Sequence, residues 1–590
     1  MPDIKRTWSV PTSPRSPYKL PQELKLLSEF EGQIWNKHTQ RRFAQMLAES
    51  DFYEGSVSET LPDFSARDRV NRSPKTFGFA RFDEQRRMRI TDAGRRLIEG
   101  ARIEELFTRQ LLKWQYPSPK HHGNRYRNFN IRPFVETLRL VYELDGLSKR
   151  EIAIFCLPLI DFRSYSSVKA EIIKFRKELS QLKNIEKRRL VIATHAAYYR
   201  KIFREELSSG SFHVRESRGR VPDEARFIAT KVRNSMDYAD AAVRYFRATG
   251  LFKLSATTFR LQVMESKLDL VKEILATTPS ESLSFEDQEI FLDFLGNPDL
   301  PALPDDRPEI LQIEIANLVK AISSKALLPK EQLDIYRQEK LVSATVSQLK
   351  ENRDKLEKLL ADDARQIQIT ALQSYSLYDD IIRMYEKIVH RADYDIPDKP
   401  LFFEWNTWRA FAMLDDGEIA CNAVLDREGK PLSTAPGGMP DGVGYYENFV
   451  LTIEVTLARG ERQFETENES VPRHLGKIIK SMRENGDERP AFGFFIASGL
   501  NMSTVAHFYA LRRSNVLHYG GKAKIVPLDL SAFKRMLTVA RDSGGMKAVQ
   551  LFTFLRWIDE KADRVENERE WYLAIDRKIP NWLSIKDVKK

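Results

Sequence analysis

The chain contains very little cysteine and no long apolar run. Only two cysteines, Cys156 and Cys421, occur among its 590 residues, which excludes a disulfide framework and a thiolate metal site. No segment approaches the roughly 18 apolar residues of a membrane-spanning helix, and the first residues lack the apolar core of a secretory signal. We therefore expect a soluble, cytoplasmic protein without a membrane partner.

Charge is divided unequally along the chain. Residues 1–260 hold 50 Lys and Arg against 31 Asp and Glu, a balance of +19, whereas the remaining 330 residues hold 44 against 53, a balance of −9. A basic half joined to an acidic half predicts a polyanion-binding part linked to a part with different chemistry. A merely basic surface remains the alternative.

The length exceeds what one hydrophobic core supports and predicts three or four domains. Apolar residues make up 42% of the sequence and aromatic residues 11%, which supports large packed interiors. The Pro-rich run from Asn297 to Pro304 is the clearest border. We expect domains at 1–140, 141–296, 297–395 and 396–590.

Two segments of the basic half have hairpin patterns. Residues 77–98 alternate aromatic and polar residues around a polar turn, which predicts a hairpin followed by a helix with Thr91 as its N-cap. In residues 236–262, an amphipathic helix is expected from Tyr238 to Thr249, ended by Gly250 and followed by two short strands. A hairpin beside such a helix is typical of winged-helix units, so we predict two different winged-helix-like units.

Basic, polar runs flank both hairpins. Residues 67–75 predict a loop, and residues 211–233 are similar in composition. Arg and Asn read guanine and adenine edges, although most basic side chains in such interfaces contact phosphates or stay solvated. Trp114 and Tyr116 are expected to pack in a core rather than stack on bases. The candidate DNA-binding residues are Arg15, Arg67, Arg69, Arg72, Lys75, Arg218, Arg220, Arg226, Lys231 and Arg233.

Residues 263–395 are dominated by Leu, Glu, Lys and Asp. Val342 to Leu360 and Ile367 to Ile388 have helical spacing with charge on the outer face. These helices suit a stiff spacer of defined length. A helical bundle that only packs domains together is equally compatible.

Residues 396–590 alternate helical and buried-strand patterns. We predict a helix at 401–414, strands within 441–456, a helix at 472–485, a strand at 491–498, a helix at 503–516 and a strand at 523–528, followed by helices. This order indicates an α/β sheet.

Two acidic residues mark a candidate metal site in this half. Glu454 lies in a predicted strand, and Asp441 precedes it by thirteen residues, just after a loop rich in Gly, Pro and Ser. Alternation places Glu454 and Thr456 on one face of the strand and the apolar residues around them on the other. A buried carboxylate needs a partner, and a divalent cation with oxygen ligands is the usual one. We therefore predict an Mg²⁺ site at Asp441 and Glu454.

Pro440-Asp441 and Glu454-Val455-Thr456 resemble the motif of the PD-(D/E)XK nuclease superfamily. Thr456 stands where that motif usually has Lys, which helps to orient the attacking water. We hypothesise that His474 or Lys477 takes over this task.

Further segments, in one order along nearly the full length, resemble the AlwI-like type IIS restriction endonucleases, including the large, strand-nicking subunits of that group. In this family Thr also follows the strand Glu. The resemblance implies that Glu404 is an outer ligand to the metal or a bound water, selects Glu467 from its acidic neighbours, and makes His474 a candidate acid or base. The segments are Ser13-Pro-Arg-Ser-Pro, Ser65-Ala-Arg-Asp-Arg-Val, Lys113-Trp-Gln-Tyr-Pro-Ser, Gly146-Leu-Ser-Lys, Arg244-Tyr-Phe-Arg-Ala-Thr-Gly-Leu-Phe, Phe403-Glu-Trp-Asn-Thr-Trp and Val471-Pro-Arg-His.

The resemblance implies a multidomain protein: α, winged-helix-like DNA-recognition domains, a helical linker and a C-terminal α/β PD-(D/E)XK-like nuclease domain. It implies a bacterial, cytoplasmic enzyme that binds a short asymmetric sequence in double-stranded DNA. With Mg²⁺ it would hydrolyse phosphodiester bonds at a fixed distance outside that sequence.

Cutting both strands would need a transient homodimer or a separate small nuclease subunit, and strand-specific nicking is the alternative. The host would also hold a cognate DNA methyltransferase. A non-catalytic, sequence-specific DNA-binding protein is a further alternative; it would bind DNA but ignore Mg²⁺.

Overall fold

The computed structural model describes residues 4–14, 16–50, 52–53, 62–121, 124–213, 221, 223–255, 258–336, 338–389, 396–413, 417–426, 429–434 and 438–584. The chain divides into two compact units. The first comprises Met1–Ser50, Gly55–Glu357 and Ala392–Pro397, and the second comprises Asp51–Glu54, Lys358–Arg391 and Asp398–Lys590. The predicted four-domain division is finer than these units and stays a prediction.

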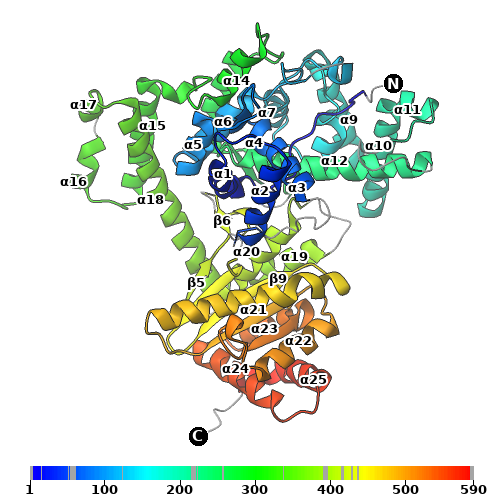
Figure 1. Ribbon diagram of the computed structural model, residues 1–590. Coiled ribbons are helices and arrows are strands. Elements are labelled where there is room, and N and C mark those ends of the chain that lie inside the picture. Colours follow the sequence, from blue (N-terminus) through cyan, green and yellow to red (C-terminus); the bar gives the residue numbers. More distant parts are fainter. Residues whose placement is uncertain are drawn as a thin grey trace. The chain divides into compact units, whose positions relative to one another are not determined.

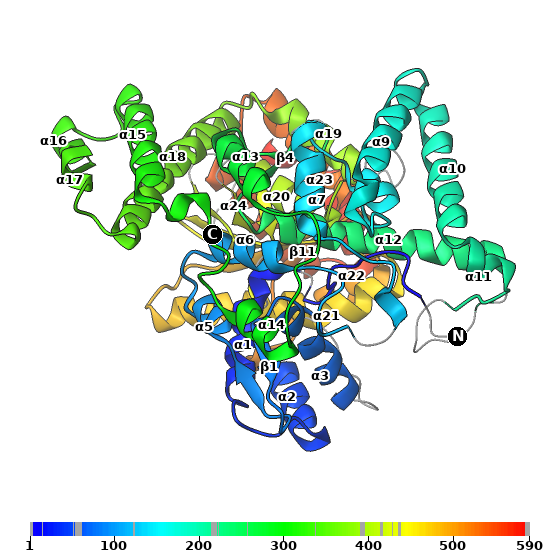
Figure 2. The ribbon, with the colours of Figure 1, turned by 90° about the horizontal axis from the view of Figure 1, so that it is seen from above.

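The first unit is mostly helical. Its cyan helices α9, α10 and α12 lie together in Figures 1 and 2. The helices of this unit are α1 Leu20–Ser28, α2 Lys37–Glu49, α3 Pro62–Asn71, α4 Ser73–Thr76, α5 Asp92–Glu99, α6 Ile103–Lys113, α7 Pro133–Glu143, α8 Lys149–Glu151, α9 Tyr165–Ser180, α10 Asn184–Ile202, α11 Arg204–Ser208, α12 Glu224–Arg247, α13 Leu268–Thr277, α14 Gln288–Gly296, α15 Pro308–Ser324, α16 Lys330–Leu333 and α17 Gln338–Leu341.

The first predicted hairpin and its helix cap are confirmed. Strand β1 (Ala80–Phe82) pairs antiparallel with β2 (Met88–Ile90). The Thr91 hydroxyl then accepts a hydrogen bond from the Gly94 backbone N–H at 3.1 Å and caps α5. The winged-helix description of this unit stays a prediction.

The second hairpin is also present, but the helix before it is longer than predicted. Strand β3 (Phe252–Leu254) pairs with β4 (Leu261–Val263), which begins later than the sequence pattern indicates. Helix α12 begins at Glu224 because the Asp223 side chain accepts a hydrogen bond from the Arg226 N–H at 2.7 Å. Residues 224–233 of the stretch predicted to resemble a loop are therefore the start of a helix.

The prediction of a loop at residues 67–75 is wrong, because this run lies in helices α3 and α4. Contacts from distant parts of the chain stabilise it. Arg69 donates through its Nε to Glu23 of α1 at 2.9 Å. The Ser73 hydroxyl lies 2.6 Å from the Tyr245 hydroxyl and donates to the Ser13 carbonyl at 2.8 Å. None of these partners is visible in the local sequence pattern.

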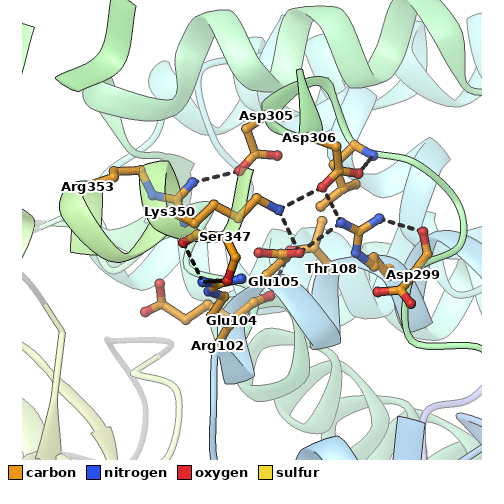
Figure 3. A network of polar contacts seen from close by, with 12 residues as sticks. Arg102, Glu104, Glu105, Thr108, Asp299, Asp305, Asp306, Ser347, Lys350 and Arg353 are labelled. Carbon is orange, nitrogen blue, oxygen red and sulfur yellow. Dashed lines mark hydrogen bonds and ion pairs between the residues drawn. The ribbon is translucent and has the colours of Figure 1, made fainter. Parts of the chain in front are cut away.

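The Pro-rich run at 297–304 is held inside the first unit by buried charges (Figure 3). Arg109 donates to the carbonyls of Asp299 and Pro301 at 2.9 and 2.6 Å. Lys350 pairs with Asp306 at 2.6 Å. Although burial raises the pKa of Asp306, hydrogen bonds from Arg109 and Lys350 outweigh burial and hold this pKa below its usual value.

A single long helix carries the chain from the first unit to the second. Helix α18 spans Val346–Gln373, and the border between the units falls within it. Its residue Arg353 donates to Asp305 at 2.7 Å inside the first unit. Two separate helical patterns were predicted over this stretch; α18 instead continues to Gln373 and is followed by α19 (Tyr378–Val389).

The second unit is built on a mixed five-stranded sheet of order β11-β10-β9-β8-β5. Strands β5, β8 and β9 pair antiparallel, whereas β9, β10 and β11 pair parallel. The strands are β5 Gly417–Cys421, β8 Gly442–Tyr446, β9 Val450–Thr456, β10 Ala491–Ala497 and β11 Ile525–Asp529, with a small ribbon of β6 Val424–Leu425 and β7 Pro431–Ser433. The predicted strands at 491–498 and 523–528 are thus confirmed to within two residues.

Helices surround this sheet, coloured from yellow-green to red in Figure 1. Helices α20 and α21 contact β9, and α22 and α23 contact β11. Because β9 is covered in this way, nearly all of its side chains are buried. The helices are α20 Lys399–Ala412, α21 Glu461–Glu484, α22 Met502–Arg513, α23 Leu530–Asp542, α24 Ala548–Ala562 and α25 Glu568–Lys578.

Helix α21 begins at Glu461, eleven residues before the predicted start at 472. Pro472, a residue type that favours the first turn of a helix, lies inside α21 instead. The early turn is held by Gln463, whose amide donates to the Ala458 and Gly499 carbonyls at 2.9 and 3.0 Å. Its carbonyl oxygen accepts from the Asn501 N–H at 2.8 Å.

Among the described residues, no helix is both long enough and apolar enough to cross a membrane.

We expect Arg353→Met to destabilise the first unit by about 3 kcal/mol, because it leaves the buried carboxylate of Asp305 without its partner. Asp305 and Arg353 are 4% and 6% exposed. Lys355→Met, at an exposed position of the same helix, is the matched control and should change stability by about 0.5 kcal/mol or less. Urea unfolding followed by circular dichroism measures both variants; equal midpoints would contradict a stabilising role for this pair.

Candidate active site and basic cavity

Asp441 and Glu454 come together at adjoining strands of the second unit. Asp441 lies immediately before β8, whose Gly442 is paired with Ile453 of β9. The Asp441 Oδ2 atom accepts a hydrogen bond from the Val455 backbone N–H at 2.8 Å. Val455 directly follows Glu454, so the Asp441 carboxylate is bound to the residue next to Glu454 on β9.

Glu454 is bound to His474 of the covering helix. Its Oε1 atom lies 2.7 Å from the His474 Nδ1 atom. Both residues are buried, with exposed fractions of 6% and 8%. His474 lies within α21, not at the start of a helix as predicted, and α21 packs on β9 and β10. The sheet and its covering helix therefore share one buried carboxylate–imidazole pair.

Glu467 lies on the same helix, close to the end of β9. Burial raises the pKa of Glu467, although hydrogen bonds from Thr456, Thr466 and Ser470 and the charge of His474 act in the opposite direction. Its acidic neighbours on α21, at 461, 465 and 469, are exposed to solvent. The structure thus separates Glu467 from its neighbours, which the sequence pattern could not do.

Glu404 belongs to α20 and precedes two tryptophans that anchor this helix. Trp405 Nε1 donates to the Gly429 carbonyl at 2.9 Å, and Trp408 Nε1 to the Ile419 carbonyl at 3.1 Å. Burial, with smaller contributions from the Glu404 and Asp441 carboxylates, raises the pKa of the Cys421 thiol to about 12. Both carboxylates therefore act on the Cys421 thiol. Cys421 lies on β5 and is paired with Gly442, the residue that follows Asp441.

The donor set suits a hard divalent cation that also binds its substrate. Within the described ranges, no three His, Cys, Asp or Glu side chains are placed to hold a cation by themselves. Mg²⁺ is usually held by one or two carboxylates together with substrate phosphates and water. The neighbouring carboxylates of Asp441 and Glu454 fit that mode, with Glu404 on the adjacent helix.

A large cavity in the first unit gathers basic and aromatic side chains. It has a volume of about 1210 Å³ and is lined by the N-terminal segment, the α3–α4 region, residues 113–121, α10, α12 and α14. We call it the basic cavity. Its acidic lining residues are Asp237 and Asp240, and its basic lining residues are Lys5, Arg6, Arg72, Lys75, Lys113, Lys120, Lys231 and Arg244.

The candidate DNA-binding residues fall into three groups. Arg15, Arg218 and Arg220 lie outside the described residues. Arg72, Lys75 and Lys231 line the basic cavity. The others lie elsewhere in the first unit: Arg69 is bound to Glu23 and Ser13, and Arg67, Arg226 and Arg233 are exposed on α3 and α12.

Two lysines of the cavity were missed by the sequence analysis. Lys113 ends α6, and its ammonium donates to the carbonyls of Phe294, Leu295 and Asn297 at 3.2, 3.0 and 2.7 Å. Lys120 follows in a turn. Both flank Trp114 and Tyr116, which are buried as predicted. Only the fold reveals that this run and residues 71–76 line one cavity.

No curated protein matches the chain. Among solved structures, it is similar to the small subunit of the heterodimeric restriction endonuclease R.BspD6I, with 26% identity and a TM-score of 0.28 over 34% of this chain and 98% of that one. It is also similar to the BpuJ1 endonuclease binding domain, solved with pyrene- and phenanthrene-modified DNA, with 12% identity and a TM-score of 0.30 over 50% of this chain and 98% of that one.

The AlwI restriction endonuclease family matches residues 75–536, which is most of the chain. The chain therefore belongs to the AlwI restriction endonuclease family and is a DNA-cleaving restriction enzyme.

Proposed function

We propose that the chain is a type IIS restriction endonuclease. It would bind a short asymmetric sequence in double-stranded DNA and hydrolyse phosphodiester bonds at a fixed distance outside it, with Mg²⁺. The observation that carries this proposal is the convergence of Asp441, Glu454 and His474, in which a buried carboxylate–imidazole pair stands beside a second carboxylate. Family membership supports DNA as the substrate.

Asp441 and Glu454 would hold the cation, with Glu404 as an outer ligand. When bound, Mg²⁺ would supply a water of lowered pKa and stabilise charge on the scissile phosphate. The Val455 N–H orients the Asp441 carboxylate. His474 orients Glu454 through Nδ1, and the carboxylate in turn favours a proton at that nitrogen.

Glu467 and Lys477 complete the set of polar groups on α21. Burial keeps a proton on Glu467 to a higher pH than on an exposed glutamate, which suits a group that passes a proton near the reacting phosphate. Lys477 lies one turn beyond His474 on the same helix. His474 or Lys477 would take the role of the lysine that Thr456 replaces in the superfamily motif.

The other predictions fit this proposal as parts of one enzyme. The winged-helix-like units at 1–140 and 141–296 would recognise DNA, with exposed Arg67, Arg226 and Arg233 as further DNA contacts. The helices at 297–395 would serve as a linker of fixed length to a PD-(D/E)XK-like nuclease domain at 396–590. Asp441 and Glu454 would form one catalytic site in the described part of the chain. One catalytic site would cut one DNA strand.

Double-strand cleavage would therefore require a transient homodimer or a separate small subunit. Strand-specific nicking is the second candidate function, favoured by the same single site. A cognate methyltransferase would protect the host DNA.

We expect Asp441→Asn to lower the rate of plasmid cleavage at least about 100-fold, since it weakens the carboxylate pair that would hold the cation. DNA affinity measured in EDTA should stay unchanged. Asp542→Asn, at an exposed aspartate of the same unit, is the control and should cleave normally. Supercoiled plasmid with Mg²⁺ is the assay: persistent open circles indicate nicking, and linear product indicates paired cleavage. Full activity of Asp441→Asn would refute the proposed site.

We expect His474→Ala to reduce turnover about 100-fold or more while leaving DNA affinity intact, because His474 contacts the carboxylate that would hold the cation. His518→Ala removes an exposed histidine of the same unit and should have no effect. Single-turnover cleavage and binding in EDTA separate the two readouts. Unchanged turnover in His474→Ala would remove His474 from the site.

Glu467→Gln should lower turnover yet stabilise the second unit at neutral pH. A glutamate whose pKa is raised in the folded state adds stability at low pH and loses it as pH rises through that folded pKa. Gln avoids this loss, so the melting temperature of the variant should exceed that of the parent at pH 8 and approach it at pH 4. Thermal unfolding in EDTA at both values tests the expectation; a variant less stable than the parent at pH 8 would contradict it.

A further inference from the structure

Two lysines of the basic cavity lie side by side with neutral partners. The Lys120 ammonium donates to the Lys75 backbone carbonyl. The Lys75 ammonium lies 4.7 Å from the centre of the Phe82 ring, and the Lys120 ammonium lies 5.9 Å from that of Phe291. A carbonyl and two rings can stabilise a cation but cannot neutralise its charge.

The two charges are costly in this position. Burial and then the charge of Arg86 lower the pKa of Lys75. Burial and then the charge of Lys75 lower the pKa of Lys120 to about 7. Two like charges taken partly out of water are mutually unfavourable. An anion placed between them would offset both the lost hydration and the repulsion.

Three other basic residues of the cavity have structural partners. Arg6 pairs with Glu206 at 3.0 Å. Arg244 is paired with Asp240 on the same helix, and the ammonium of Lys113 is bound to three carbonyls at the end of α14. These contacts shape the wall of the cavity, and Lys75 and Lys120 bring two further positive charges close together in it.

We propose that Lys75 and Lys120 form a phosphate clamp that binds a backbone phosphodiester of double-stranded DNA in the basic cavity. The inference rests on the proposed function, because it takes the recognised DNA as the occupant. Charge complementarity supports this occupant: the clamp lies in a cavity whose walls include α4, next to the first hairpin, and α12, before the second. Contacts of this kind position a duplex without reading its sequence.

Binding through the clamp takes up a proton. A phosphate beside Lys120 favours its charged form, so the pKa of Lys120 rises from about 7 when DNA binds. Below pH 7 the lysine is already charged, whereas above pH 7 it must first gain a proton. DNA affinity should therefore fall about tenfold between pH 6 and pH 8. The charge of Arg86 also acts on Lys75. The other charged or titratable groups that line the cavity are Lys5, Arg6, Arg72, Lys113, Tyr116, His121, Tyr126, Tyr199, Lys231, Asp237, Tyr238, Asp240 and Arg244.

The first test measures duplex binding in EDTA, so that cleavage plays no part. Lys75→Gln and Lys120→Gln should each weaken binding about tenfold, to cognate and unrelated duplexes alike, and should lower the slope of log affinity against log salt by about one. Lys320→Gln, at an exposed lysine of α15, is the matched control and should bind as the parent does. Equal melting temperatures establish that the variants fold.

The second test uses charge rescue. Lys120→Arg keeps a cation that does not titrate, so this variant should bind DNA as tightly at pH 8 as at pH 6. His121→Gln should retain the pH dependence of the parent, because the clamp places the proton on Lys120. The competing cavity groups are His121, a residue type that ordinarily titrates near this range, and Lys113, whose pKa is lowered by burial to about 6. A pH dependence that survives in Lys120→Arg and vanishes in His121→Gln would assign the proton to His121 and overturn the clamp.

Two further outcomes would overturn the inference. Unchanged duplex affinity in both Lys→Gln variants would exclude the clamp. Inorganic phosphate could instead raise the melting temperature of the parent but not that of Lys120→Gln, while the two proteins bind the duplex equally well. That result would make the two lysines a site for free phosphate. If the parent binds DNA with the expected dependence on salt, pH and the two lysines but shows no Mg²⁺-dependent cleavage, this result would count against the proposed nuclease function alone.

Discussion

The second unit depends on one buried hydrogen bond, between Glu454 of β9 and His474 of α21. Strand β9 is the central strand of the sheet and is covered by helices. A carboxylate there loses most of its hydration and needs a partner within the fold. His474 supplies it at 2.7 Å, beside Val471 and Leu475 of α21, which pack into the core of the unit. Glu467 and Lys477 lie on the same helix.

The first unit handles buried charge in two different ways. Around Asp305 and Asp306, each buried cation has a carboxylate partner, and the network joins α6, the Pro-rich run and the start of α18. Lys75 and Lys120 are instead stabilised by rings and a carbonyl. The first arrangement is complete without a ligand and serves architecture. The second gains from an incoming anion, which is what a polyanion-binding surface requires.

Local patterns predicted the short-range structure well. The hairpin at 77–98 with its Thr91 cap and the two parallel strands after β9 have periodicity and turn chemistry that depend only on neighbouring residues. Predictions failed where a distant contact outweighed the local pattern. Residues 67–75 are helical because Arg69 and Ser73 have partners on other elements. Helix α21 starts early because Gln463 ties its first turn to two loops.

Several properties of this protein follow from the sequence by itself. They are the division of charge, the α/β pattern of the last third, the selection of Asp441 and Glu454 as one candidate site, and the family resemblance. The tertiary structure decided the rest: Glu467 among its acidic neighbours, the pairing of His474 with Glu454, and the presence of Lys120 beside Lys75. Spacing along a chain predicts which side chains share a strand or a helix face. Only the packing of those elements determines which side chains lose water together, and burial with a particular partner is what changes their chemistry.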